Sequence, residues 1–96
     1  MPRIISIIVT GKVQRVNFRK KTQEEAIRLG ITGTIKNVGN NEVHIEAIGE
    51  PEPIDHFINW CKKGPELATV ESIQVKDISQ RNFGSFNVIR NRNTPL

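Results

Sequence analysis

The chain has 96 residues, a length that supports a single domain with a modest hydrophobic core, and we expect residues 1–96 to form one domain. Its single cysteine excludes a disulfide framework, no zinc-ligand spacing is present, and the longest apolar stretch is too short to span a membrane. With no signal-peptide pattern, we expect a cytoplasmic protein without a membrane partner, and the formal net charge of +4 favours anionic partners.

The first half of the chain predicts a strand, a helix and a hairpin. Ile5, Ile7 and Val9 alternate with Ser6 and Thr10, which is the period of a strand, although Ile4 and Ile8 make the other face partly apolar. Residues 18–30 have the period of a helix with one apolar face, ending at a glycine. Residues 32–38 and 42–48 predict two strands joined by Gly39-Asn40-Asn41, whose residue types tolerate the positive φ of a tight turn.

A second helix is expected from Ile54 to Lys63. Gly64-Pro65 should end it, because glycine forms the C-terminal cap and proline cannot continue the helix. Its apolar residues recur at the spacing of one helix face, and they are Ile54, Phe57, Ile58 and Cys61. We interpret His44 and His56 as surface residues and Trp60 as a packing residue, so we do not expect cysteine or histidine catalysis.

The last part of the chain predicts two more strands. Residues 69–78 form a strand-like run that directs Ile73 and Val75 toward the core, and residues 86–88 mark a short strand after a polar turn. The tail, residues 91–96, shows no pattern and is expected to fray.

The predicted order is β-α-β-β-α-β with an extra C-terminal strand. Each β-α-β unit requires a right-handed crossover, which places both helices on one face of an antiparallel sheet. The expected fold class is therefore α+β, a ferredoxin-like α/β sandwich. This fold hosts many unrelated activities, so the function must be inferred from particular residues.

One loop carries an unusual concentration of positive charge. The segment KVQRVNFRK, residues 12–20, joins the first strand to the first helix. Arg19, Lys20 and Lys21 fall in the first helical turn, where the helix dipole disfavours cations by about 0.3–1 kcal/mol. An anion bound at the helix N-terminus would explain them. Such loops usually contain glycine, yet Arg15 stands at the centre, so three interpretations are open: a phosphate-binding loop with an additional cationic side chain, a phosphate-binding loop blocked by that side chain, or no phosphate-binding loop.

Other ligand classes are less well supported by the sequence. Gly11 is not followed by the residues of a Walker loop, and no G-x-G-x-x-G motif is present. A ferredoxin-like RNA-binding domain needs stacking aromatic residues on its central strands, and residues 4–10 and 42–48 contain none. We therefore expect no nucleic-acid partner.

Two sequence blocks resemble those of a known family. GKVQRVNFR is similar to the acylphosphatase signature G-x-V-Q-G-V-x-F-R, and LGITGTIKN resembles the second block of that family, L-G-x-x-G-x-V-x-N. Further similarity runs in order through EVHIEAIGE, FINWCKKGP, ATVESIQV and FGSFNVIR. The chain thus resembles the acylphosphatase family along nearly its whole length.

The resemblance implies a monomeric hydrolase of small acyl phosphates that releases a carboxylate and inorganic phosphate, with phosphate as product and inhibitor and with no metal or cofactor. It implies that Arg19 and Asn37 are catalytic. It also implies a phosphate-binding loop made by Gln14, Arg15, Val16, Asn17 and Phe18.

Two positions depart from the family pattern. Arg15 replaces the loop glycine, so the alternative reading is a catalytically impaired phosphate-binding domain of the same fold. Thr34 stands where the family often has an aromatic residue, which would alter substrate access.

Overall fold

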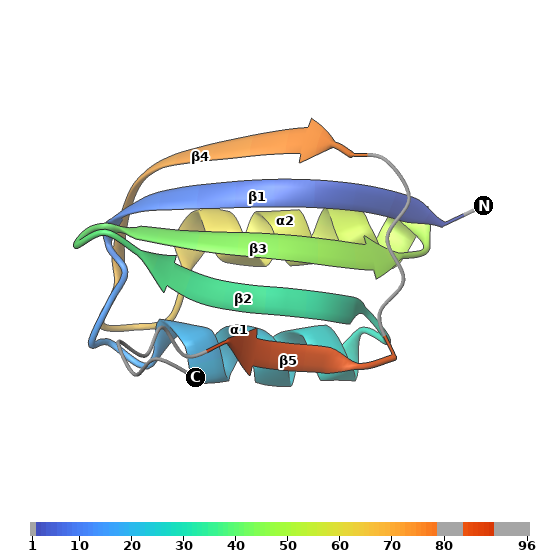
Figure 1. Cartoon of the computed structure of the whole chain (residues 1–96), viewed down its shortest axis with the longest axis horizontal. Coiled ribbons are helices and arrows are strands. Elements are labelled where there is room, and N and C mark those ends of the chain that lie inside the picture. Colours follow the sequence, from blue (N-terminus) through green and yellow to red (C-terminus); the bar gives the residue numbers. More distant parts are fainter. Residues whose placement is uncertain (1, 79–83, 90–96) are drawn as a thin grey trace, which may run out of the picture.

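A computed structural model describes residues 2–78 and 84–89 as one five-stranded sheet with two helices packed on a single face (Figure 1). This arrangement confirms the ferredoxin-like sandwich with an extra C-terminal strand. The strands are β1 (Arg3–Lys12), β2 (Thr32–Val38), β3 (Glu42–Gly49), β4 (Thr69–Asp77) and β5 (Phe86–Ile89), and the helices are α1 (Phe18–Arg28) and α2 (Pro51–Lys63).

The sheet has the strand order β4-β1-β3-β2-β5. The pairs β1–β4, β1–β3 and β2–β3 are antiparallel, as predicted, but β5 pairs with β2 in parallel, beginning at Gly33 and Phe86. The expectation of an antiparallel sheet is therefore wrong for this one pair. Strands β4 and β5 lie at opposite edges of the sheet and run in opposite directions, so that β5 runs the same way as its neighbour β2 (Figure 1).

The core lies between the sheet and the helices. On β3 the alternating residues Val43, Ile45 and Ala47 are fully buried, as predicted. The helices bury Phe18, Thr22 and Ala26 from α1 and Ile54, Phe57 and Cys61 from α2. Trp60 packs edge-on against Phe18 with ring centroids 5.9 Å apart, so its predicted packing role is confirmed.

Two sequence-based expectations need correction. Val75 pairs with the buried Ile7 and so lies on the helix-covered face of the sheet as predicted, but it is 39% exposed, because β4 is an edge strand whose side chains are mostly exposed. Helix α2 begins at Pro51, three residues before the predicted start at Ile54. Proline is tolerated in the first helical turn because its missing N–H would have no intrahelical partner there.

The helix ends follow the predicted signals. Gly64 caps α2 with φ 73° and Gly30 follows α1 with φ 72°, both in the left-handed region that glycine adopts readily. Neither helix in the described part of the chain is long and apolar enough to cross a membrane. Most of the polar turn expected before β5, and the whole tail 91–96, lie outside the described residues.

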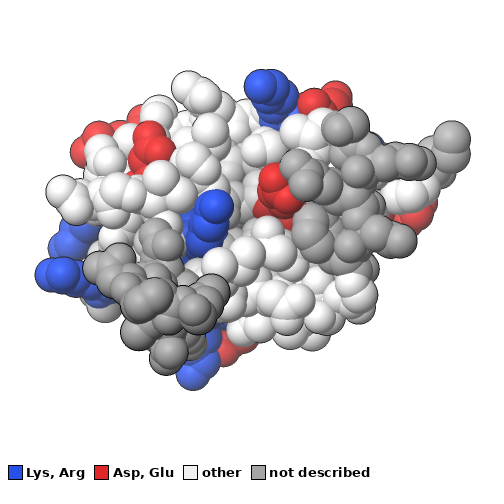
Figure 2. Space-filling view, viewed as in Figure 1, with Lys and Arg blue, Asp and Glu red and all other residues white. Residues whose placement is uncertain are grey.

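Several connections meet at one end of the sandwich. The loop between β1 and α1, the turn between β2 and β3, and the loop between α2 and β4 all lie at the left of Figure 1, and the β5 arrow points toward this end. Figure 2 shows the same view with basic side chains visible at this end. The fold therefore brings the basic loop predicted from sequence next to the end of β2.

Candidate active site

The loop between β1 and α1 has a backbone shape suited to an anion. Arg15 and Asn17 have φ 63° and 65°, and no other non-glycine residue in the described ranges has a positive φ. The sign of φ thus alternates along residues 14–18, and such alternation turns successive N–H groups toward one side in an anion-binding nest. Val13 and Val16 are buried and hold the loop to the core.

The start of α1 adds further donors to this loop. The first intrahelical bond closes from the Lys21 N–H to the Asn17 carbonyl at 3.0 Å, so the preceding N–H groups are not used by the helix. No acidic residue lies in the first turn, although Arg19, Lys20 and Lys21 do. Positive side chains and the positive end of the helix dipole therefore gather at one point, which favours a bound anion.

The Gln14 side chain fastens the loop to the neighbouring hairpin. Its Nε2 donates to the backbone carbonyls of Gly39 and Glu42, both at 3.0 Å, and to that of Val38 at 3.4 Å. In addition, the Gly11 N–H donates to the Asn41 carbonyl at 2.9 Å. Since Val38 follows Asn37 directly, these bonds hold the loop at a set separation from the end of β2.

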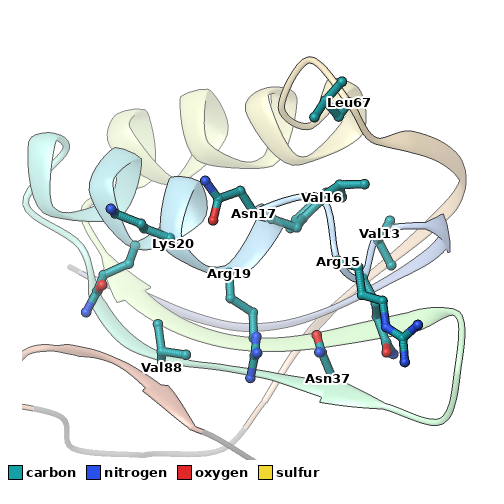
Figure 3. A pocket seen from close by; sticks show the side chains of 12 residues that line it. Val13, Arg15, Val16, Asn17, Arg19, Lys20, Asn37, Leu67 and Val88 are labelled. Atoms are coloured by element: carbon teal, nitrogen blue, oxygen red, sulfur yellow. The ribbon is translucent and has the colours of Figure 1, made fainter.

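Arg19 and Asn37 approach the pocket from different elements. Arg19 is on the first turn of α1, and its Nη1 donates to the Ile89 carbonyl on β5 at 3.4 Å. Asn37 lies near the end of β2 with its Oδ1 buried. In Figure 3 the Arg15 and Arg19 side chains lie on either side of Asn37. The structure thus brings together the two residues predicted to be catalytic.

These groups line a pocket of about 750 Å³. Its lining includes all five predicted loop residues, together with Arg19 and Asn37. Three cations, Arg15, Arg19 and Lys20, are among the residues that line the pocket, and no carboxylate of the described residues lines it. A pocket with this charge favours a substrate carrying more than one negative charge.

Sequence reasoning missed part of the pocket wall. Leu67, in the loop between α2 and β4, and Val88, on β5, contribute apolar surface to it. Leu67 is 70% exposed, and nothing in its local sequence indicates a ligand. Only the packing of distant elements places these two residues beside the loop.

Thr34 does not belong to this pocket. It lines a separate hollow on the sheet face that the helices leave uncovered, together with Lys36 and His44. The expectation that Thr34 alters access to the phosphate loop is therefore wrong, because successive residues of β2 point to opposite faces of the sheet.

The remaining candidate groups have structural surroundings. Burial raises the pKa of the Cys61 thiol, so this buried cysteine is a poor nucleophile. His44 Nε2 lies 2.9 Å from Glu42 Oε1 on the uncovered face, and His56 is exposed on α2. Neither histidine is among the residues lining the large pocket.

The fold and the pocket together define a small α+β domain built around a candidate anion site. The family model named Acylphosphatase matches residues 5–88. An acylphosphatase from Vibrio parahaemolyticus is 42% identical over 82 residues, covering 85% of this chain and 91% of that protein. One from Archaeoglobus fulgidus is 43% identical over 84 residues, covering 88% and 94%.

A solved structure agrees with the sequence relatives. The structure of an acylphosphatase from Coxiella burnetii superposes with a TM-score of 0.89 at 32% identity, covering 92% of this chain and 93% of that one. The chain therefore belongs to the acylphosphatase family.

Proposed function

We propose that this protein hydrolyses small acyl phosphates to a carboxylate and inorganic phosphate, with Arg19 and Asn37 as its catalytic residues. The observation that carries the proposal is the meeting of Arg19, Asn37 and the loop N–H groups in one basic pocket. Family membership over residues 5–88 supports the same activity. The catalytically impaired alternative is not favoured by these relatives.

Phosphoryl binding is assigned to Arg19 and the loop. A guanidinium offers a planar pair of donors that matches two phosphoryl oxygens. The backbone N–H groups of residues 14–18 supply fixed dipoles that need no reorganisation as charge develops in the transition state. Phosphoryl transfer depends mainly on such positioning and charge stabilisation.

Asn37 is assigned to the attacking water. Its amide can hold a water in line with the bond to be broken, but it cannot deprotonate that water. The water oxygen forms a bond to phosphorus while the bond between phosphorus and the acyl oxygen breaks, and the carboxylate leaves with the electron pair. The proton of the water passes to the phosphate, and no strong general acid is required because a carboxylate is a good leaving group.

Arg15 is compatible with turnover in this scheme. Its side chain is exposed, and the pocket of about 750 Å³ is open in its presence. These features favour an Arg15 side chain that binds an anion at the mouth of the pocket over one that blocks the pocket.

A hydrolysis assay on benzoyl phosphate tests the proposal. We expect turnover that EDTA does not change and that inorganic phosphate inhibits competitively. Arg28→Ala is the matched control for Arg19→Ala, because Arg28 is in the last turn of the same helix, does not line the pocket, and pairs with Glu25. Absence of turnover, or equal loss in both variants, would contradict the assigned activity or site.

The proposal has three further parts that stay predictions from the sequence. They are a single domain over residues 1–96, a monomeric state and a cytoplasmic location. Size-exclusion chromatography with light scattering measures the oligomeric state directly.

A further inference from the structure

The Arg15 side chain is available to a ligand. It is exposed, it lines the pocket, and it makes no hydrogen bond or ion pair that involves a described residue. Arg19, by comparison, donates to the Ile89 carbonyl. The two guanidinium groups approach the pocket on either side of Asn37 (Figure 3). Arg19 is therefore already held by a hydrogen bond, whereas Arg15 is available to bind a second group of the substrate.

The charge of the pocket exceeds what a phosphoryl group alone requires. In the proposed function, Arg19 and the nest of loop N–H groups bind the phosphoryl oxygens. Arg15 and Lys20 add positive charge to the same pocket, and no described carboxylate lines it to balance them. Arginine binds carboxylates well, because its planar fork matches both oxygens of the group.

The backbone conformation at Arg15 gives no reason for an arginine at this position, so the reason must lie in its side chain. With φ 63°, this position is one that glycine adopts without strain and arginine does not. The left-handed backbone at this position turns the loop N–H groups toward the pocket, whichever side chain is attached. What arginine adds is a charged side chain at the mouth of the pocket.

We propose that this enzyme prefers acyl phosphates whose acyl group carries a carboxylate, and that Arg15 binds that carboxylate. The inference rests on the proposed function and names its substrate class. Arg19 and the loop hold the phosphoryl end, while Arg15 holds the far end of the acyl group.

Two substrates of equal size test the preference. 4-Carboxybenzoyl phosphate carries the second anion on a rigid ring, and 4-carbamoylbenzoyl phosphate replaces it with a neutral amide of nearly the same shape. For the wild type we expect kcat/KM to be about three- to tenfold higher for the carboxylate, as for a charge-assisted contact at a partly exposed site. Added potassium chloride should reduce this ratio.

Two variants that each remove one positive charge distinguish a direct contact between Arg15 and the substrate carboxylate from a general electrostatic attraction by the basic residues. In Arg15→Gln we expect the ratio of kcat/KM values to fall to about one. Lys21→Gln removes the same charge from the first turn of α1, but Lys21 does not line the pocket, so this variant should keep the wild-type ratio. Circular dichroism melting of both variants verifies that each is folded.

The outcomes distinguish the inference from the activity on which it rests. If the wild type hydrolyses benzoyl phosphate but shows no preference for the carboxylate, the proposed substrate class is wrong. If the preference persists in Arg15→Gln, or is lost equally in Lys21→Gln, Arg15 is not the group that binds the carboxylate. If none of the three substrates is hydrolysed, the proposed function itself fails and this inference fails with it.

Discussion

Replacing Arg15 with glycine tests whether the loop backbone is strained. With φ 63°, Arg15 is left-handed, which costs an L-residue roughly 1–2 kcal/mol. Glycine removes that strain, but its greater backbone freedom stabilises the unfolded chain by roughly 0.4–1 kcal/mol. The exposed guanidinium has no described partner to lose, so Arg15→Gly should stabilise the fold by about 0.5–1 kcal/mol. For a domain of this size that gain raises Tm by roughly 2–8 °C.

Arg15→Ala is the matched control for this measurement. Alanine keeps the Cβ atom and hence the strain, so its stability in urea should stay close to that of the wild type. Both variants should raise KM and the phosphate Ki by about two- to fivefold, because both lose the same exposed charge, with kcat preserved or increased. Equal stability of the two variants would refute the strain argument. A gain in kcat of several orders of magnitude in Arg15→Gly would instead show that Arg15 blocks the site.

The other predictions concern residues around the same pocket and in the core. Arg19→Ala should nearly abolish hydrolysis with little change in Tm, and Arg19→Lys should rescue poorly because an ammonium cannot bind two oxygens as a fork; wild-type kinetics in either variant would refute its role. Asn37→Ala should lower kcat by on the order of 10²–10³ while phosphate inhibition is retained, and loss of phosphate binding with normal kcat would reverse the roles of Asn37 and Arg19. Gln14→Met should lower the free energy of unfolding by about 0.5–1.5 kcal/mol in urea, because the partly exposed carbonyls bonded by Nε2 lose their donor; an unchanged value would show that those bonds contribute little. Cys61 should resist a thiol reagent in the native protein and react only on unfolding, because it is buried and its pKa is raised; rapid native labelling would contradict this.

Local patterns in the sequence were sufficient to predict the order of helices and strands. The alternation along residues 42–48 and the apolar stripe of α2 depend only on which face of an element is buried, so both predictions were confirmed. Gly64 ended α2 as expected, because a positive φ at a helix terminus is a local requirement. The resemblance to the family located Arg19 and Asn37 through motif positions, and the structure places both at one pocket.

Tertiary structure decided what no local pattern contains. The parallel pairing of β5 with β2 depends on which sheet edge the returning chain reaches, and the positions of Leu67 and Val88 depend on the same packing of distant elements. Motif position assigned Gln14 to the phosphate loop, yet its side chain amide donates to the β2–β3 turn.

Arg15 illustrates the same division at one residue. The sequence showed only that arginine stands where the family signature has glycine. An arginine that binds the phosphate and an arginine that blocks its site were both compatible with that. The left-handed backbone and exposed side chain of Arg15 follow from the closure of the short loop between β1 and α1, whose ends are held by strand pairing and by the buried Val13 and Val16. The φ of Arg15 depends on contacts at both ends of the loop, so the identity of residue 15 alone could not predict it.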